Sequence, residues 1–249
     1  MRSRSTRRLP AVAGALVALA VAGLAACTGG GSGSDATDDA KAAALAGNPS
    51  VSPAPPGKYQ TLPQPCGTVD LGTLKKLVPG LEDYAGTESL TYDTDRRVGC
   101  GWTSTASDGT GISLRVDLER VVSYDPQVSD EVQATLDFDK QQSAASIPVP
   151  SATTPPASTD AAGGSPGDGP EVAPRRLMNV GNTAFINDHV HTVPVGHRRD
   201  VSLVFRTANV LVSVSYSQSS GPHDPSPSSV DLQKGAQQVA GQLEKKVTG

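Results

Sequence analysis

Two low-complexity stretches limit where this 249-residue chain can form packed structure. One runs from Thr28 to about Pro65 and the other from about Ile147 to Pro174, and both are rich in Pro, Gly, Ser and Ala. Such segments contain too little apolar surface to offset the entropy lost on ordering them. We therefore predict that the core is built from two separate pieces, before and after the second stretch.

The first piece contains one helical pattern and several strand patterns. Asp70 can cap a helix that Pro79 and Gly80 end, with apolar side chains at helical spacing: Leu74, Leu77, Val78 and Leu81. Short β-prone runs follow at 89–92, 97–104 and 111–120. In the last run apolar and polar residues alternate, which indicates a strand with one solvated face. Ser129 then begins a predicted helix that reaches about Ala145.

The second piece repeats this theme. Residues 177–186 are predicted to form a strand, and 201–206 and 210–217 to form a hairpin. Ser228 and Asp231 resemble a capping box. The helix after them carries one apolar face: Leu232, Ala236, Val239, Leu243 and Val247.

Neither piece alone offers much core, but each has an amphipathic helix beside strands with one polar face. A single antiparallel β-sheet with two or three helices packed on one face satisfies both, and it defines an α+β fold. The stretch 147–174 is then a disordered insertion within one domain. The alternative is that it separates two small domains.

The N-terminus indicates export. Four arginines precede an apolar segment from Leu9 to Ala26, which is short and weakly hydrophobic for a permanent span. The run Leu24-Ala25-Ala26-Cys27 resembles a lipobox, the cleavage motif of bacterial lipoprotein signal peptides. The resemblance implies cleavage before Cys27 and a diacylglyceryl group on its sulfur. An uncleaved transmembrane anchor is the alternative, and it also leaves the rest of the chain outside the membrane.

These features give the predicted organisation of the chain. Residues 1–26 form the signal peptide, 27–62 the lipidated cysteine with a flexible stalk, and 63–249 the folded domain. A coil from Thr28 to Pro65 would reach about 35 Å. Two acyl chains suffice for a stable anchor, so we expect the protein on the outer face of the cytoplasmic membrane, lipid-anchored and extracytoplasmic.

Charge argues against a nucleic-acid partner. Residues 1–26 hold four of the 21 basic residues and no acidic ones, which leaves a net charge of −8 on the remainder. Neutralisation of phosphates by basic side chains is the main source of affinity for nucleic acids. We expect no nucleic-acid binding, and membrane attachment through lipid rather than through basic residues.

Cys66 and Cys100 both lie in the exported part, where oxidation is possible. A disulfide between them would close a 35-residue loop. Two unpaired buried thiols are the alternative. Trp102, two residues after Cys100, is expected to pack beside this bridge, although a ligand-stacking role is conceivable for a lone Trp.

A family resemblance rests on these motifs. Pro65-Cys66-Gly67, an amphipathic helix and then Cys100-Gly101-Trp102, all behind a lipobox and a polar stalk, resemble actinobacterial lipoproteins of the DUF3558 type. The segment 179–185, the hairpin and the final helix follow in that family's order. The resemblance implies the α+β fold, lipidation and the disulfide, but no activity. It also suggests kinship with helix-on-sheet folds of the PsbP and Mog1 type.

No motif for nucleophilic, metal-dependent or phosphate-binding catalysis is found, and we expect neither an enzyme nor a cofactor. The acidic pairs at 93 and 95 and at 137 and 139 are expected to be solvated surface carboxylates. His189 and His191 would share one strand face, and His197 could approach them across a turn to form a metal site. Exposed loop histidines are the favoured interpretation, so no metal is expected, and the metal site is the alternative.

Two function classes remain. The first is a lipid-anchored, non-enzymatic binding or interaction module of the cell envelope, with an envelope protein or small ligand as its unidentified partner. The second is an envelope protein that binds a small ligand between sheet and helices, or a metal at His189, His191 and His197.

Overall fold

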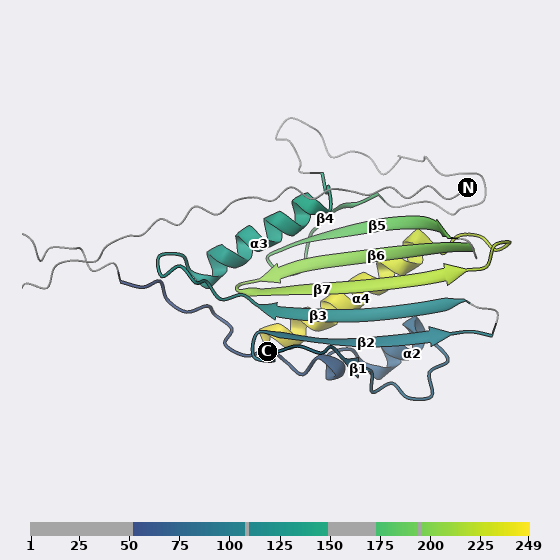
Figure 1. Ribbon diagram of the computed structural model, residues 1–249, viewed down its shortest axis with the longest axis horizontal. Helices are drawn as coiled ribbons and strands as arrows, with labels where there is room; N and C mark the ends of the chain where they lie inside the picture. The colour runs from purple at the N-terminus through teal and green to yellow at the C-terminus, as the bar shows by residue number, and fades with distance from the viewer. Residues whose placement is uncertain (1–51, 108–109, 149–172, 194–195) are drawn as a thin grey trace, which may run out of the picture. The chain divides into compact units, whose positions relative to one another are not determined.

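The computed structural model describes residues 52–107, 110–148, 173–193 and 196–249, which form an α+β fold (Figure 1). Its centre is one antiparallel sheet of seven strands in the order β1-β2-β3-β7-β6-β5-β4. The strands are β1 (Thr87–Glu88), β2 (Arg97–Thr105), β3 (Gly111–Arg120), β4 (Arg175–Leu177), β5 (Thr183–Val193), β6 (Gly196–Thr207) and β7 (Val210–Ser220). The helical elements are η1 (Pro65–Gly67), α2 (Leu71–Leu77), α3 (Asp130–Ala144) and α4 (Ser229–Thr248). The predicted fold class, a single antiparallel sheet with helices, is confirmed.

The two pieces of the chain meet at the centre of the sheet. Strand β3 pairs with β7 over nine residues, in a register that aligns Leu114 with Tyr216 and Val116 with Val214. Elements from before and after residues 149–172 therefore share one sheet, as the predicted single domain requires. The predicted insertion itself lies mostly outside the described residues, as do residues 1–51, including the predicted signal peptide and Cys27.

One face of the sheet packs against α4 and α2. The predicted apolar face of α4 is buried and joins alternate residues of β3, β5, β6 and β7 in the larger core cluster. Ser228 caps α4, because its hydroxyl accepts a hydrogen bond from the Asp231 backbone N–H at 3.2 Å. The predicted apolar face of the helix and its start at Ser228 are thus confirmed.

Helix α2 forms where Asp70 predicted it, but Asp70 does not cap it through its side chain. The helix stops at Leu77, and Gly80 reverses the chain with a positive φ of 84°. The carbonyl of Leu77 accepts a 2.8 Å hydrogen bond from the buried Tyr216 hydroxyl of β7. This contact fixes the end of α2 to the centre of the sheet.

Helix α3 lies on the opposite face of the sheet. Phe138 stacks against Phe185 of β5 with ring centroids 5.5 Å apart, in a second, smaller core cluster with Ala134, Val204 and Leu211. The three strand residues point away from α4 because neighbouring residues of a strand face opposite sides. Helices α2 and α4 thus pack on one face of the sheet, and α3 covers one end of the opposite face.

Two predicted strands are wrong in their bounds. Residues 89–92 form a loop after the short β1, and the run 177–186 is split between β4 and β5 by a tight turn. Asn179 and Gly181 both have positive φ in that turn, which reverses the chain. A Cβ on Gly181 would lie 2.5 Å from the Arg206 carbonyl oxygen, so the turn requires glycine.

The N-terminal part of the domain extends into the predicted stalk. The Gly57 N–H donates to the Asp130 carboxylate at 2.9 Å, and Tyr59 exchanges two backbone hydrogen bonds with the buried side-chain amide of Asn209. A Cβ on Gly57 would lie 2.4 Å from Asn209 Nδ2, so the chain passes in close contact. Residues 57–59 therefore lie against the domain rather than in a flexible stalk.

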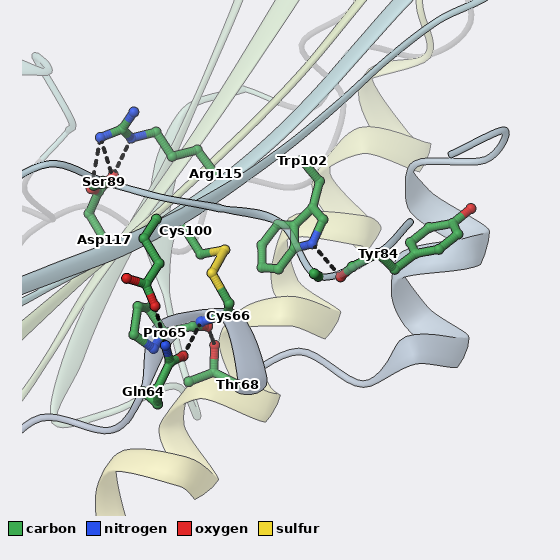
Figure 2. The surroundings of a disulfide bond; sticks show 12 residues. Gln64, Pro65, Cys66, Thr68, Tyr84, Ser89, Cys100, Trp102, Arg115 and Asp117 are labelled. Atoms are coloured by element: carbon green, nitrogen blue, oxygen red, sulfur yellow. Dashed lines mark hydrogen bonds and ion pairs between the residues drawn. A yellow bond between two sulfur atoms is a disulfide. The ribbon is translucent and has the colours of Figure 1, made fainter. Parts of the chain in front are cut away.

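Cys66 and Cys100 form a disulfide, with their Cα atoms 5.1 Å apart (Figure 2). It joins η1 to the middle of β2. Trp102 follows on the same strand face, is buried, and donates its indole N–H to the Tyr84 carbonyl at 3.0 Å. The predicted bridge and the predicted packing of Trp102 in the core are both confirmed.

Replacing both cysteines tests the contribution of this bridge. The free energy of unfolding is expected to fall by about 3–4 kcal/mol in a Cys66→Ala/Cys100→Ala variant, because the unfolded chain regains the freedom of a 35-residue loop. Denaturant unfolding of the two proteins measures the difference. An unchanged denaturation midpoint would show that the disulfide contributes no stability.

Tyr216 gives the fold a defined response to alkaline pH. Burial, followed by the nearby Asp231 charge, raises the pKa of Tyr216 above its usual value of 10. The unfolded state then ionises first, so the contribution of Tyr216 to stability is complete below pH 10 and is lost as pH rises through its folded pKa. Tyr216→Phe is expected to cost about 1 kcal/mol at neutral pH and to flatten the loss of stability at alkaline pH. Unfolding curves of both proteins across pH 7–11 check this.

Candidate functional site

The sheet face opposite α4 is open where α3 does not cover it. Strand β7 supplies its middle row through Ser213, Ser215, Ser217 and Ser219, which alternate with apolar or larger residues that face α4. Across the ladder, Ser217 aligns with Ser113 of β3, and Ser215 aligns with Ser202 of β6. We call these six residues the serine face.

The short side chains of the serine face form a low floor between longer flanking residues. A hollow of about 430 Å³ lies over β3, β7 and β6. Its lining includes Ser113, Arg115, Arg198, Asp200, Ser202, Ser215 and Ser217. The sequence analysis identified β7 as a strand but missed this surface. The signal was the alternation Val-Ser-Val-Ser-Tyr-Ser over residues 212–217.

Arg115 borders the hollow on the β3 side. Its guanidinium forms a 2.8 Å ion pair with Asp117, two residues along the strand, and donates to the Ser89 hydroxyl at 2.9 Å (Figure 2). The hydrogen bond with Asp117, reinforced by its charge, raises the pKa of Arg115 above its already high ordinary value. The guanidinium therefore stays charged at any physiological pH.

Arg198 borders the hollow on the β6 side in the same way. It pairs with Asp200 at 2.9 Å, again two residues along the strand, and donates to the Ser217 hydroxyl at 3.1 Å. About half of each arginine side chain is exposed, and exposed ion pairs contribute little to stability. Both arginines can therefore exchange an acidic partner for a bound ligand at small cost.

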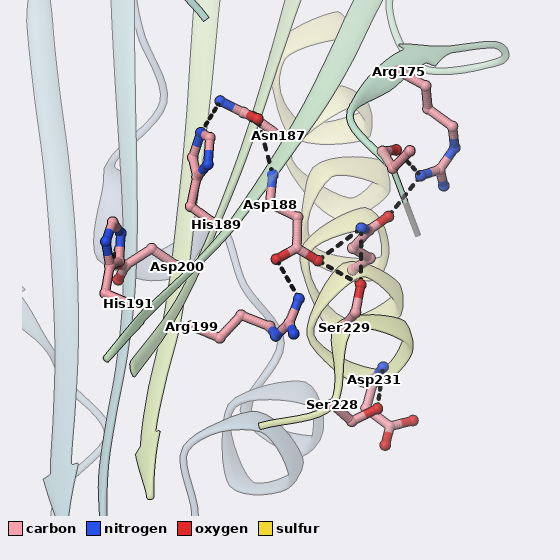
Figure 3. Close-up of polar contacts among 12 residues, drawn as sticks. Arg175, Asn187, Asp188, His189, His191, Arg199, Asp200, Ser228, Ser229 and Asp231 are labelled. Atoms are coloured by element: carbon pink, nitrogen blue, oxygen red, sulfur yellow. Dashed lines mark hydrogen bonds and ion pairs between the residues drawn. The ribbon is translucent and has the colours of Figure 1, made fainter. Parts of the chain in front are cut away.

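His189 and His191 lie next to the hollow, on the same face of β5, as predicted (Figure 3). Their ring centroids are 6.3 Å apart. His189 is hydrogen-bonded to the Asn187 amide, and His191 lies 3.4 Å from an Asp200 carboxylate oxygen. Both residues are exposed, as expected, but they lie in a regular strand rather than in a loop.

His197 does not join the other two histidines. It pairs with Thr192 across the β5–β6 ladder and lies two residues before Arg199, which turns towards α4. The sheet therefore separates His197 from His189 and His191, and the three-histidine arrangement is not formed. Within the described ranges, no group of three or more histidine, cysteine or acidic residues is placed to hold a metal ion.

A buried ion pair fixes this edge of the sheet to α4. Asp188 of β5 pairs with Arg199 of β6 at 2.8 Å, and both side chains are almost fully buried (Figure 3). The second Asp188 oxygen accepts hydrogen bonds from Ser229 and Gln233 in the first turns of α4. A carboxylate is favoured there because a helix N-terminus carries partial positive charge. The cluster is enclosed, so we assign it to structure rather than binding.

Removing one partner of this pair tests that assignment. Asp188→Ala leaves the Arg199 charge buried without its carboxylate, and the free energy of unfolding is expected to fall by about 3–5 kcal/mol. Asp188→Leu combined with Arg199→Met removes both charges and is expected to cost far less. Urea unfolding compares the variants. A double variant as unstable as the single one would contradict the ion-pair explanation.

Cys27, the predicted lipidation site, lies outside the described residues. None of the helices in the described ranges has the length and apolar character needed to cross a bilayer. Comparisons with protein-family models, with curated proteins and with solved structures gave no match.

The arrangement on the open face is suited to binding. The two arginines and their two aspartates balance in charge, and the serine hydroxyls can both donate and accept hydrogen bonds. The surface can therefore recognise a polar partner through exchangeable hydrogen bonds.

Proposed function

We propose that this chain is a lipid-anchored extracytoplasmic protein of the cell envelope, a non-enzymatic module that binds its partner through the serine face. The observation that carries the proposal is the uncovered hollow of about 430 Å³ between Arg115 and Arg198. The fold does not need this surface, since its core lies between the sheet and α4 and under α3.

The anchor comes from the sequence. The lipobox ending at Cys27 supports export and attachment to the outer face of the cytoplasmic membrane. The disulfide between Cys66 and Cys100 is consistent with an oxidising compartment. We also propose membership of the DUF3558-type lipoproteins, with the PsbP and Mog1 folds as distant relatives. The order of motifs around the two cysteines and Trp102 supports this kinship.

The size and chemistry of the hollow favour a polar partner. Its volume is within the range of ligand pockets in proteins, and seven of its nine lining residues are serine, arginine or aspartate. Arginine can hold a carboxylate or phosphate group of a partner through two parallel hydrogen bonds. An envelope protein with an acidic or hydroxyl-rich loop fits this surface, and a small polar ligand is the second candidate.

Site-specific photo-crosslinking in living cells tests the proposal. A photoreactive residue replaces Ser202, on the floor of the hollow, in the full-length chain, and Ser143 on the exposed end of α3 serves as the matched position. We expect a discrete adduct from position 202 that position 143 does not give. Adding Ser215→Arg, which fills the hollow, should abolish it.

Two further results separate the parts of the proposal. Cys27→Ser should release the protein from the membrane fraction and lose the adduct if capture requires anchoring. Identical adducts from positions 202 and 143 would contradict a role for the serine face. A co-purifying small molecule, seen by native mass spectrometry and lost with Ser215→Arg, would favour the small-ligand candidate.

A further inference from the structure

The polypeptide enters the folded domain at one end of the sheet (Figure 1). The Ala54 N–H donates to the Pro126 carbonyl at 2.7 Å, and Gly57 and Tyr59 are then held by Asp130 and Asn209. These partners lie where β3 ends, where α3 begins and in the β6–β7 turn. We call this the tether end, because the predicted anchor at Cys27 joins the domain here.

The tether end exposes large apolar side chains. Leu90 and Tyr92 are fully exposed in the loop before β2, and Tyr124 is 86% exposed in the loop after β3. The two loops are adjacent, because the first residue of β2 pairs with the last part of β3. Exposed apolar side chains gathered at one end of a domain are candidates for an interaction surface.

Arg96 joins the two loops. Its guanidinium lies over the Tyr124 ring, 5.3 Å from the centroid, and donates to the Tyr124 hydroxyl. Its backbone N–H donates to Asp93 in the loop that carries Leu90 and Tyr92. Arg96 therefore links the loop that carries Leu90 and Tyr92 to the loop that carries Tyr124.

The charges at the tether end do not favour a partner of either sign. Acidic and basic residues both occur in and beside the two loops: Asp93, Asp95, Arg96, Arg97 and Asp125. Tyrosine and leucine suit a boundary between water and hydrocarbon, because tyrosine combines an apolar ring with a hydroxyl that stays hydrated. The chemistry of this end therefore fits a lipid surface better than a charged polymer.

We propose that the tether end docks on the lipid surface that holds Cys27, with Leu90, Tyr92 and Tyr124 at the boundary between headgroups and acyl chains. This inference rests on the anchor in the proposed function. The 28 residues from Cys27 to Ala54 make 27 Cα–Cα steps, which span at most about 95 Å. A tether of that length keeps the effective concentration of the surface high, so a weak contact is sufficient.

Docking at this end would orient the serine face. The long strands run between the tether end and the opposite end of the sheet (Figure 1). The strands would then stand away from the membrane, and the serine face would open sideways, accessible to a partner beside the protein.

Tryptophan fluorescence in reconstituted vesicles tests the docking. The full mature lipoprotein is placed in vesicles of phosphatidylglycerol and phosphatidylethanolamine with brominated acyl chains. The native Trp102 is buried and alone in the sequence, so it supplies a constant background. Tyr92→Trp reports on the tether end, and Ala106→Trp, in the turn between β2 and β3, places the same side chain at the opposite end.

We expect bromolipid to quench the Tyr92→Trp variant several-fold more strongly than the Ala106→Trp variant. Adding Leu90→Ser and Tyr124→Ser should remove most of that difference. Equal quenching in protein that floats with the vesicles would overturn the docking and leave the anchor intact. Protein that does not float with the vesicles would overturn the anchor, and the docking with it.

Discussion

The β3–β7 ladder is the interaction on which the rest of this structure depends. It joins a three-stranded unit from the first half of the chain to a four-stranded unit from the second half. Without it, α4 would cover only the second unit, and α2 with the disulfide would brace strands that lack a core. The ladder also brings Arg115 of β3 onto the same face as Arg198 of β6, with the serines of β7 between the two strands. The core and the candidate binding surface thus arise from one pairing.

The alternation of side chains explains why much of the fold could be predicted. Strand β3 and helix α4 each have one apolar face, and a residue on that face is buried almost wherever the element packs. The prediction errors arose where backbone conformation or long-range contacts, rather than side-chain alternation, determine the local structure. The run Asn179-Val180-Gly181-Asn182 is itself a turn signal, because Asn and Gly tolerate positive φ. The β-prone residues on both sides of it make the segment resemble one continuous strand. The contacts of Gly57 and Tyr59 depend on Asn209, 150 residues from Tyr59, which no local pattern encodes.

The candidate site was harder to predict than the fold. Histidines attract attention in a sequence, but the β5–β6 register places His197 and His191 on opposite faces of the sheet. Serines are rarely chosen as candidate site residues, yet six of them lie on one face here because three strands pair in one particular register. Recognition surfaces assembled from short polar residues are visible only after the strands have been aligned. The same holds for the loops that carry Leu90 and Tyr124, which the β2–β3 pairing brings to the same end of the sheet.

Cys27 matters most for the proposed function, because a lipid on its sulfur would hold the serine face and the tether end close to the membrane. Mass spectrometry of the N-terminal peptide, from protein extracted out of the membrane fraction, tests it most directly. We predict a peptide that begins at Cys27 and carries the added mass of a diacylglyceryl group. A peptide that begins upstream of Cys27, or an unmodified cysteine, would contradict the account.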